Sequence, residues 1–293
     1  MKALRPFALC FALPALALGA APAHSADEAP PKGLRVFSAG HSFHMFVPNI
    51  LTDIAKVAGI KDHKQVGANG IGGSRTIQHW EQPDDKNKTK DALKKGAVDV
   101  LTLAPIYHPD AGIDNFVRLG LEHNPNLRVT VQASWLPFDV YDPDYQTKKL
   151  PVKVEREART VEEMKKLHLK YSTAMDEQVN AINKAHGKPV VFVVPVGQAA
   201  ILLRGKIIEG KAPGLKKQED LFTDAIGHPT DPLRVLNAYC HYAVIYKRSP
   251  VGLPMPAALK NAKTAEWDEK LNALLQELAW EAVTSHPLSG VRK

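Results

Sequence analysis

The chain reads Leu34-Arg35-Val36-Phe37-Ser38-Ala39-Gly40-His41-Ser42 at the point that decides its fold. The first residues of this stretch form a short apolar run, which is typical of a buried strand. A helix-like segment follows at residues 47–57. A serine on a tight turn between a strand and a helix projects its hydroxyl from the carboxyl end of a sheet, where N–H groups at the helix start can face a developing anion. The stretch therefore predicts an α/β fold with Ser42 where a hydrolase places its nucleophile.

Strand-like and helix-like segments alternate along the rest of the chain. Short β-branched or apolar runs predict strands at 34–38, 98–103, 128–133 and 190–194, and a weaker one near 63–67. Helices are predicted at 47–57, 87–95, 112–123, 161–186, 197–209, 232–246 and 265–284. Such alternation favours a parallel sheet with helices on both faces. We expect a flavodoxin-like three-layer α/β/α sandwich with a central parallel sheet of about five strands, forming one domain over residues 34–290.

The first residues have the features of a targeting segment. Lys2 and Arg5 precede an apolar run at 7–18, and small residues follow at 21–25. This order predicts a cleaved signal peptide over residues 1–25, with an uncleaved anchor as the alternative. Residues 26–33 are Pro-rich and acidic and are expected to be a linker. The protein is therefore expected to be secreted or periplasmic, without stable membrane insertion after cleavage.

Charge and cysteine content limit the partners and the cross-links. The formal net charge of the 293 residues is +7, and it becomes +5 without residues 1–25, which hold two basic residues and no acidic one. The basic residues are dispersed and form no cluster with aromatic residues, so nucleic-acid binding is not expected. Cys240 is the one cysteine left after cleavage, which excludes an internal disulfide. We expect Cys240 to be buried in a helix.

Four clusters of polar or glycine residues follow predicted strands or lie on neighbouring loops. They are residues 40–44, 70–74, 105–108 and 224–228. Ligands of open parallel sheets bind at the carboxyl ends of the strands. The clusters therefore predict a site at one edge of the sheet.

The clusters contain the groups that a nucleophilic serine needs. Serine reacts poorly without a base, and His228 is the best candidate. Asp224 lies four residues earlier and could hold the imidazole tautomer. The alternative is that Asp224 and His228 are turn and helix-capping residues. Gly72 and Gly73 allow unusual φ values, and their N–H groups could stabilise an oxyanion together with the N–H of Ser42.

These motifs resemble the SGNH/GDSL hydrolase superfamily of lipases and esterases, of which the chain looks like a divergent member over residues 34–250. By resemblance, Ser42 in Gly40-His41-Ser42-Phe43 matches the nucleophile block. Gly72 or Gly73 matches the second-block glycine of the oxyanion hole, and Asp224 and His228 match the acid and the base of the last block. The resemblance implies the fold of this superfamily and hydrolysis of an ester by a serine nucleophile.

The sequence departs from the family pattern at three places. His41 stands where the family has aspartate, and the spacing from Asp224 to His228 is one residue longer than usual. The asparagine of the third block is not evident, because residues 101–105 read Leu-Thr-Leu-Ala-Pro where it is expected. The oxyanion hole would then use backbone donors alone or a group such as Gln132.

Further residues are candidates for the pocket. They are His41, His44, His79, Trp80, Gln132 and Trp135, with core packing as the alternative for Trp80. The spacing of the histidines at 41, 44, 79 and 108 does not resemble a zinc-binding motif, so no metal site is predicted. The long segment 137–157 is expected either to cover the site or to be a surface excursion.

The sequence as a whole predicts a secreted serine esterase. It would hydrolyse an acyl or acetyl ester, in a small molecule or on a carbohydrate, through an acyl-enzyme intermediate and without a cofactor. The first alternative is a catalytically degenerate protein of the same fold that binds a glycan or another ligand. The second is a metal-dependent hydrolase that uses the histidines.

Overall fold

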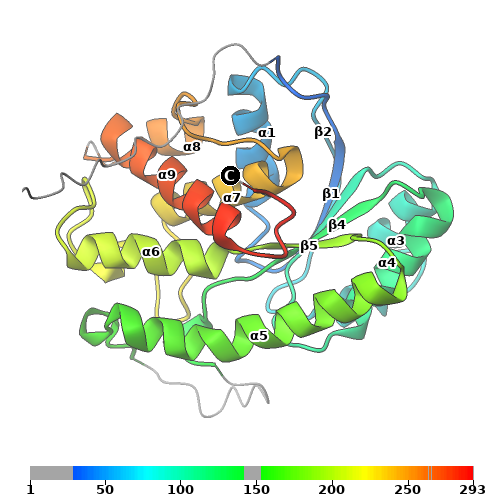
Figure 1. Ribbon diagram of the computed structural model, residues 1–293, viewed down its shortest axis with the longest axis horizontal. Coiled ribbons are helices and arrows are strands. Elements are labelled where there is room, and N and C mark those ends of the chain that lie inside the picture. The colour runs from blue at the N-terminus through cyan, green and yellow to red at the C-terminus, as the bar shows by residue number, and fades with distance from the viewer. Residues whose placement is uncertain (1–28, 142–152, 263, 265, 293) are drawn as a thin grey trace, which may run out of the picture.

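A parallel sheet of five strands forms the centre of the computed structural model, which describes residues 29–141, 153–262, 264 and 266–292 (Figure 1). The strand order is β2-β1-β3-β4-β5, and every neighbouring pair is parallel. The strands are β1 (Arg35–Gly40), β2 (Lys64–Gly70), β3 (Val100–Leu103), β4 (Arg128–Gln132) and β5 (Val191–Val194). The predicted α/β class and the five-stranded parallel sheet are therefore confirmed.

Helices cover both faces of this sheet, as predicted. The longer ones are α1 (Val47–Val57), α4 (Ala111–His123), α5 (Val161–Ala185), α6 (Val196–Ile208), α7 (Asp231–Tyr246) and α9 (Glu269–Ser285). The shorter ones are α2 (Thr76–Trp80), α3 (Lys88–Lys94) and α8 (Ala257–Lys260), with 3-10 turns η1 (Pro137–Asp139), η3 (Arg156–Ala158) and η4 (Gln218–Leu221). The sequence did not predict α2 or α8, which are too short to show a helical period. Helix α9 starts at its N-cap Asp268, whose side chain accepts hydrogen bonds from Lys270 and Leu271 N–H, so the predicted start at 265 was wrong.

Two apolar cores lie on opposite faces of the sheet. Helices α1, α6, α7 and α9 lie on one face, and α3, α4 and α5 lie on the other (Figure 1). Buried side chains of the first group form one core and those of the second group form the other. Helix α7 is buried from Pro232 to Tyr246 except for Arg234, and Cys240 is buried within it as expected. A helix that is apolar on every side needs neighbours on every side. Helix α7 accordingly packs among α1, α6 and α9.

A buried ion pair joins the segment after β4 to α6. Arg204 Nη1 and Nη2 donate to the Asp139 carboxylate, at 2.9 and 2.7 Å. Arg204 Nε donates to Gln218 Oε1 at 2.7 Å. The two charged side chains are 5% and 7% exposed. Removing one partner of a buried ion pair leaves an uncompensated charge in the interior and lowers the free energy of unfolding. An exposed ion pair contributes little to this free energy.

Asp139→Asn should lower the free energy of unfolding by about 3 kcal/mol, because Arg204 would keep its charge without a buried counter-ion. Asparagine also tolerates the positive φ of 52° at this position, so the backbone is not the cause. Urea unfolding measures the change. Asp231→Asn, in the more exposed Asp231–Arg234 pair, is the matched control and should cost less than about 1 kcal/mol. Equal effects of the two substitutions would contradict the assignment.

Candidate active site

The turn that carries Ser42 starts where β1 ends, at Gly40. A Cβ at Gly40 would lie 2.9 Å from Ala104 Cβ and 3.1 Å from the His44 ring, so only glycine fits between the turn and the end of β3. The chain then turns through residues 42–46 into α1, which has Pro48 in its first turn. Ser42 is left exposed at the carboxyl edge of the sheet.

Ser42, His228 and Asp224 are joined by hydrogen bonds. His228 Nε2 lies 2.9 Å from Ser42 Oγ, and His228 Nδ1 lies 2.6 Å from Asp224 Oδ2. Because the carboxylate accepts the Nδ1 proton, Nε2 is left without one and can accept the proton of the serine hydroxyl. The structure thus brings together the three residues that the sequence proposed, across 186 positions of the chain between Ser42 and His228.

The longer spacing between Asp224 and His228 is taken up by a folded loop. Asp224 Oδ1 accepts hydrogen bonds from the N–H groups of Gly227 and His228, at 2.9 and 3.1 Å. Gly227 has a φ of +102°, which lets the chain double back so that the carboxylate and the imidazole meet. Burial raises the pKa of Asp224, but the hydrogen bonds from the His228 ring and from both N–H groups outweigh it and lower the pKa. The carboxylate is therefore held in its ionised form.

The segment after β4 fixes this loop from the other side. Trp135 Nε1 donates to Gly227 O at 2.9 Å, and Phe138 N donates to Ile226 O at 3.0 Å. Arg156, almost fully buried, donates from Nη2 to Ala225 O at 2.7 Å. The sequence pointed to Trp135 and to the segment 137–157, but it gave no sign of the part played by Arg156. Residues 142–152 of that segment lie outside the described residues.

Gly227→Ala should lower kcat/KM at least tenfold, because an alanine resists the positive φ and a displaced His228 loses its alignment. Steady-state kinetics on an ester substrate measures the change. Gly210→Ala is the matched control: Gly210 also has a positive φ, of 66°, but ends α6 with open space around its Cβ position. It should cost stability and leave kcat/KM unchanged. A similar loss of activity in both variants would argue against a special role for the Gly227 turn.

A buried polar network anchors the serine turn to the strands. Gln132 Oε1 accepts from His44 Nδ1 at 2.8 Å and from His241 Nε2 at 3.0 Å, while Gln132 Nε2 donates to Phe43 O at 2.9 Å. His44 Nε2 is also hydrogen bonded to the Thr102 hydroxyl, at 2.8 Å. Burial lowers the pKa of His44 to about 4, so the ring is neutral inside the protein. Gln132 and His44 therefore position the turn from within.

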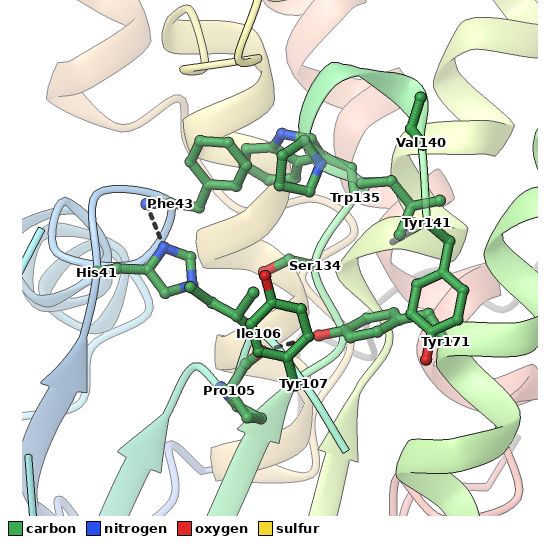
Figure 2. A pocket seen from close by; sticks show the side chains of 12 residues that line it. His41, Phe43, Pro105, Ile106, Tyr107, Ser134, Trp135, Val140, Tyr141 and Tyr171 are labelled. Carbon is green, nitrogen blue, oxygen red and sulfur yellow. Dashed lines mark hydrogen bonds between the residues drawn. The ribbon is translucent and has the colours of Figure 1, made fainter. Parts of the chain in front are cut away.

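An apolar cavity lies beside the serine turn (Figure 2). It is built from the turn itself, from the segments that follow β3 and β4, and from one side chain of α5. Its lining residues are His41, Phe43, Pro105, Ile106, Tyr107, Ser134, Trp135, Leu136, Pro137, Val140, Tyr141 and Tyr171. Phe43 stacks on Trp135 at 4.8 Å and meets the His228 ring edge-on at 5.4 Å. Phe43 thus connects the cavity with the Ser42–His228 pair.

Among the pocket residues that the sequence proposed, His41 and Trp135 line this cavity. The structure corrects the prediction for the other four, which do not line the cavity: His44, His79 and Gln132 are buried elsewhere, and Trp80 is half-buried. His44 and Gln132 belong to the buried network, and this also removes Gln132 as a borrowed oxyanion donor. His79 is hydrogen bonded to Ser74 at 2.7 Å, and Trp80 packs edge-on against Phe116.

The glycine loop starts beside the serine turn. Ile71 N donates to Gly40 O at 3.1 Å, directly after the last residue of β2. Gly72 and Gly73 are exposed in this loop, and Gly73 has a φ of +58°. The loop therefore begins next to the turn, at the carboxyl edge of the sheet.

Two features of the described residues concern metals and membranes. Within the described part of the chain, no three His, Cys, Asp or Glu side chains are grouped in a way that could hold a metal ion. His108, for example, is bound through Nδ1 to Gln178 Oε1 at 2.9 Å. None of the described helices has the length and apolar character that a bilayer-spanning segment needs.

Comparisons with known proteins give matches at the level of structure. No protein-family model and no curated protein matches the sequence. The fold is similar to that of a DUF4886 family protein from Bacteroides uniformis, with 14% identity and a TM-score of 0.54 over 87% of this chain and 96% of the other. At this identity the likeness shows a shared fold.

Two further structures are more distant. One is a protein assigned as an SGNH hydrolase from Slackia heliotrinireducens, with 14% identity and a TM-score of 0.44 over 72% of this chain and 97% of that one. The other is assigned as a GDSL-like lipase from Parabacteroides merdae, with 12% identity and a TM-score of 0.43 over 71% and 94% of the two chains.

Proposed function

We propose that this protein is a serine esterase of the SGNH type. The observation that carries the proposal is the chain of hydrogen bonds from Ser42 through His228 to Asp224, at 2.9 and 2.6 Å, on the exposed carboxyl edge of the sheet. Such an arrangement activates a serine that is otherwise a weak nucleophile. The apolar cavity beside the serine supports a substrate with a carbonyl carbon next to an apolar group.

The proposed reaction runs through an acyl-enzyme intermediate. His228 Nε2 takes the proton of Ser42 while Oγ attacks the ester carbonyl, and Asp224 stabilises the imidazolium that forms. The N–H groups of Ser42 and of Gly72 or Gly73 are the proposed backbone donors to the oxyanion. When the tetrahedral intermediate collapses, the alcohol leaves with the proton from His228. Water then attacks the acyl-enzyme by the same route, which releases the acid and restores Ser42.

A fluorophosphonate probe tests the nucleophile directly, because it forms a covalent adduct with an activated serine. We expect one adduct per chain, mapped by mass spectrometry to the peptide that contains Ser42, and none in Ser42→Ala. Prior unfolding should abolish labelling, since the reactivity depends on His228. Labelling at another serine would contradict the proposal.

The apolar lining favours an acyl group longer than acetyl. Each methylene buried from water contributes about 0.8 kcal/mol, so four more methylenes in the cavity could raise kcat/KM about 100-fold. We expect p-nitrophenyl hexanoate to be hydrolysed at least tenfold faster than the acetate, judged by kcat/KM. A preference for acetate would indicate that the cavity does not receive the acyl chain. Because Ser42 is exposed, the proposal also includes a carbohydrate as the alcohol.

Two other functions remain as alternatives with distinct outcomes. A protein that only binds a glycan or another ligand is favoured by the missing third-block asparagine, and it would show no hydrolysis across a broad ester panel. A metal-dependent hydrolase would lose its activity with a chelator.

We also propose export by the N-terminal segment, with cleavage near residue 25. Residues 1–28 lie outside the described part of the chain.

A further inference from the structure

The first residues after β3 carry no side-chain donor where the sequence resemblance leads one to expect an asparagine. Ala104, Pro105 and Ile106 carry no polar side-chain atom, and Pro105 has no N–H group. The side chain that lies with this segment around the cavity is His41, which projects from the turn after β1 (Figure 2). His41 is also the residue that replaces the usual aspartate of the nucleophile block. Two of the three departures from the family pattern, His41 and the missing asparagine, thus concern residues around the same cavity.

The hydrogen bonding of His41 leaves one nitrogen free. Its Nδ1 accepts a hydrogen bond from Phe43 N at 3.3 Å, which places the ring proton on Nε2. The residue is only 6% exposed, and Nε2 is buried without a hydrogen-bond partner among the described residues. An unsatisfied buried donor costs free energy and calls for a partner. The cavity is the space from which such a partner would come.

The ring also stays neutral. Burial, together with the nearby His44, His79 and His228, lowers the pKa of His41 to about 3. A neutral imidazole keeps its Nε2–H at any working pH and does not compete with His228 for Asp224. It is therefore an uncharged donor on the residue that directly precedes Ser42 in the chain.

We propose that His41 Nε2–H is an oxyanion-hole donor that binds the carbonyl oxygen of the ester and the tetrahedral oxyanion, in place of the absent asparagine. This inference rests on the proposed esterase function. A donor already oriented toward the developing charge stabilises the transition state without reorganisation. The alternative is a purely structural role, in which His41 only holds the turn through Phe43 N–H.

Two substitutions separate these roles, because each keeps one function of the ring. His41→Gln places an amide N–H close to the position of Nε2 and lacks the acceptor for Phe43. His41→Asn keeps an acceptor close to the position of Nδ1 and does not reach the Nε2 position. With hexanoate ester as substrate, His41→Asn should lose about 100-fold in kcat with KM changed little, and His41→Gln should lose less than tenfold. The opposite order would assign His41 to the turn and overturn the proposal.

A structure of the unaltered protein gives a test that does not depend on the folding of variants. An alkyl boronic acid forms a tetrahedral adduct with an activated serine, and its oxygens mimic the oxyanion. A boronate oxygen within about 3.2 Å of His41 Nε2 would support the proposal, whereas no boronate oxygen near this nitrogen would overturn it. If esterase activity does not depend on Ser42, the proposed function fails and this inference with it. If activity depends on Ser42 but both His41 variants keep full kcat, only this inference fails.

Discussion

Ser42→Ala should lower kcat for p-nitrophenyl hexanoate by about 10⁴- to 10⁶-fold, with KM changed little. The reason is that the substitution removes the atom that attacks the carbonyl, while the backbone N–H groups and the cavity that bind the ester remain. The residual rate would come from these donors alone. Steady-state kinetics on purified protein measures the effect.

The fold should survive this substitution, because Ser42 is exposed and its Oγ is bound only to His228 among the described residues. An unchanged melting temperature is therefore the control for the activity loss. Wild-type protein treated with a chelator is the second control and should keep its full rate. Activity that persists in Ser42→Ala would rule out the serine mechanism, and activity that disappears with the chelator would favour a metal-dependent one.

Acid should destabilise this protein strongly, by at least about 5 kcal/mol between pH 6.5 and pH 4. Burial lowers the pKa of His41 to about 3 and of His44 to about 4, and it lowers the pKa of His241 well below its usual value. Below about pH 6.5 the unfolded chain binds protons at these residues and the folded protein does not. Stability is therefore fully present above pH 6.5 and is lost as the pH falls.

The size of the effect follows from the shifts. A histidine with a pKa of about 4 in the folded state contributes up to about 3 kcal/mol between pH 6.5 and pH 4. His41 and His44 both contribute on this scale, and the lowered pKa of His241 acts in the same direction. Asp176 opposes them, because burial raises its pKa to about 6 and it takes up a proton in the folded state. The urea midpoint should therefore fall steeply between pH 6.5 and 4.5. His241→Gln, which keeps a donor to Gln132, should make this dependence shallower, and a flat profile in the wild type would contradict the buried neutral histidines.

Most strands and helices could be predicted from short stretches of sequence, because residues close together in the chain determine their formation. The strand that precedes Gly40 and helix α1 follow from a short apolar run and from helical periodicity, and both are where the sequence placed them, within a few residues. The order of strands and helices along the chain also sufficed for the parallel sheet. Short elements such as α2 and α8 were missed, because a single helical turn has no period that a sequence can show.

The site was predictable in its reactive groups and less so in its surroundings. Ser42, Asp224 and His228 stand out by residue type, spacing and the loops that they occupy. The sequence did not distinguish a polar residue that faces a cavity from one that is satisfied in the core. His44 and Gln132 were proposed for the pocket, yet they are hydrogen bonded to each other across 88 positions of the chain.

The residue pattern was enough to predict the alternation of strands and helices, the parallel sheet, and a serine, a histidine and an aspartate at the edge of that sheet. Contacts between distant segments became evident only in the folded protein: Asp224 reaches His228, Arg156 and Trp135 hold the loop of these two residues, and His41 lines the cavity while its Nε2 has no hydrogen-bond partner among the described residues. The difference lies in how far apart in the sequence the interacting residues are. Strand and helix preferences depend on neighbouring residues, whereas the position of a side-chain proton depends on partners brought from distant parts of the chain.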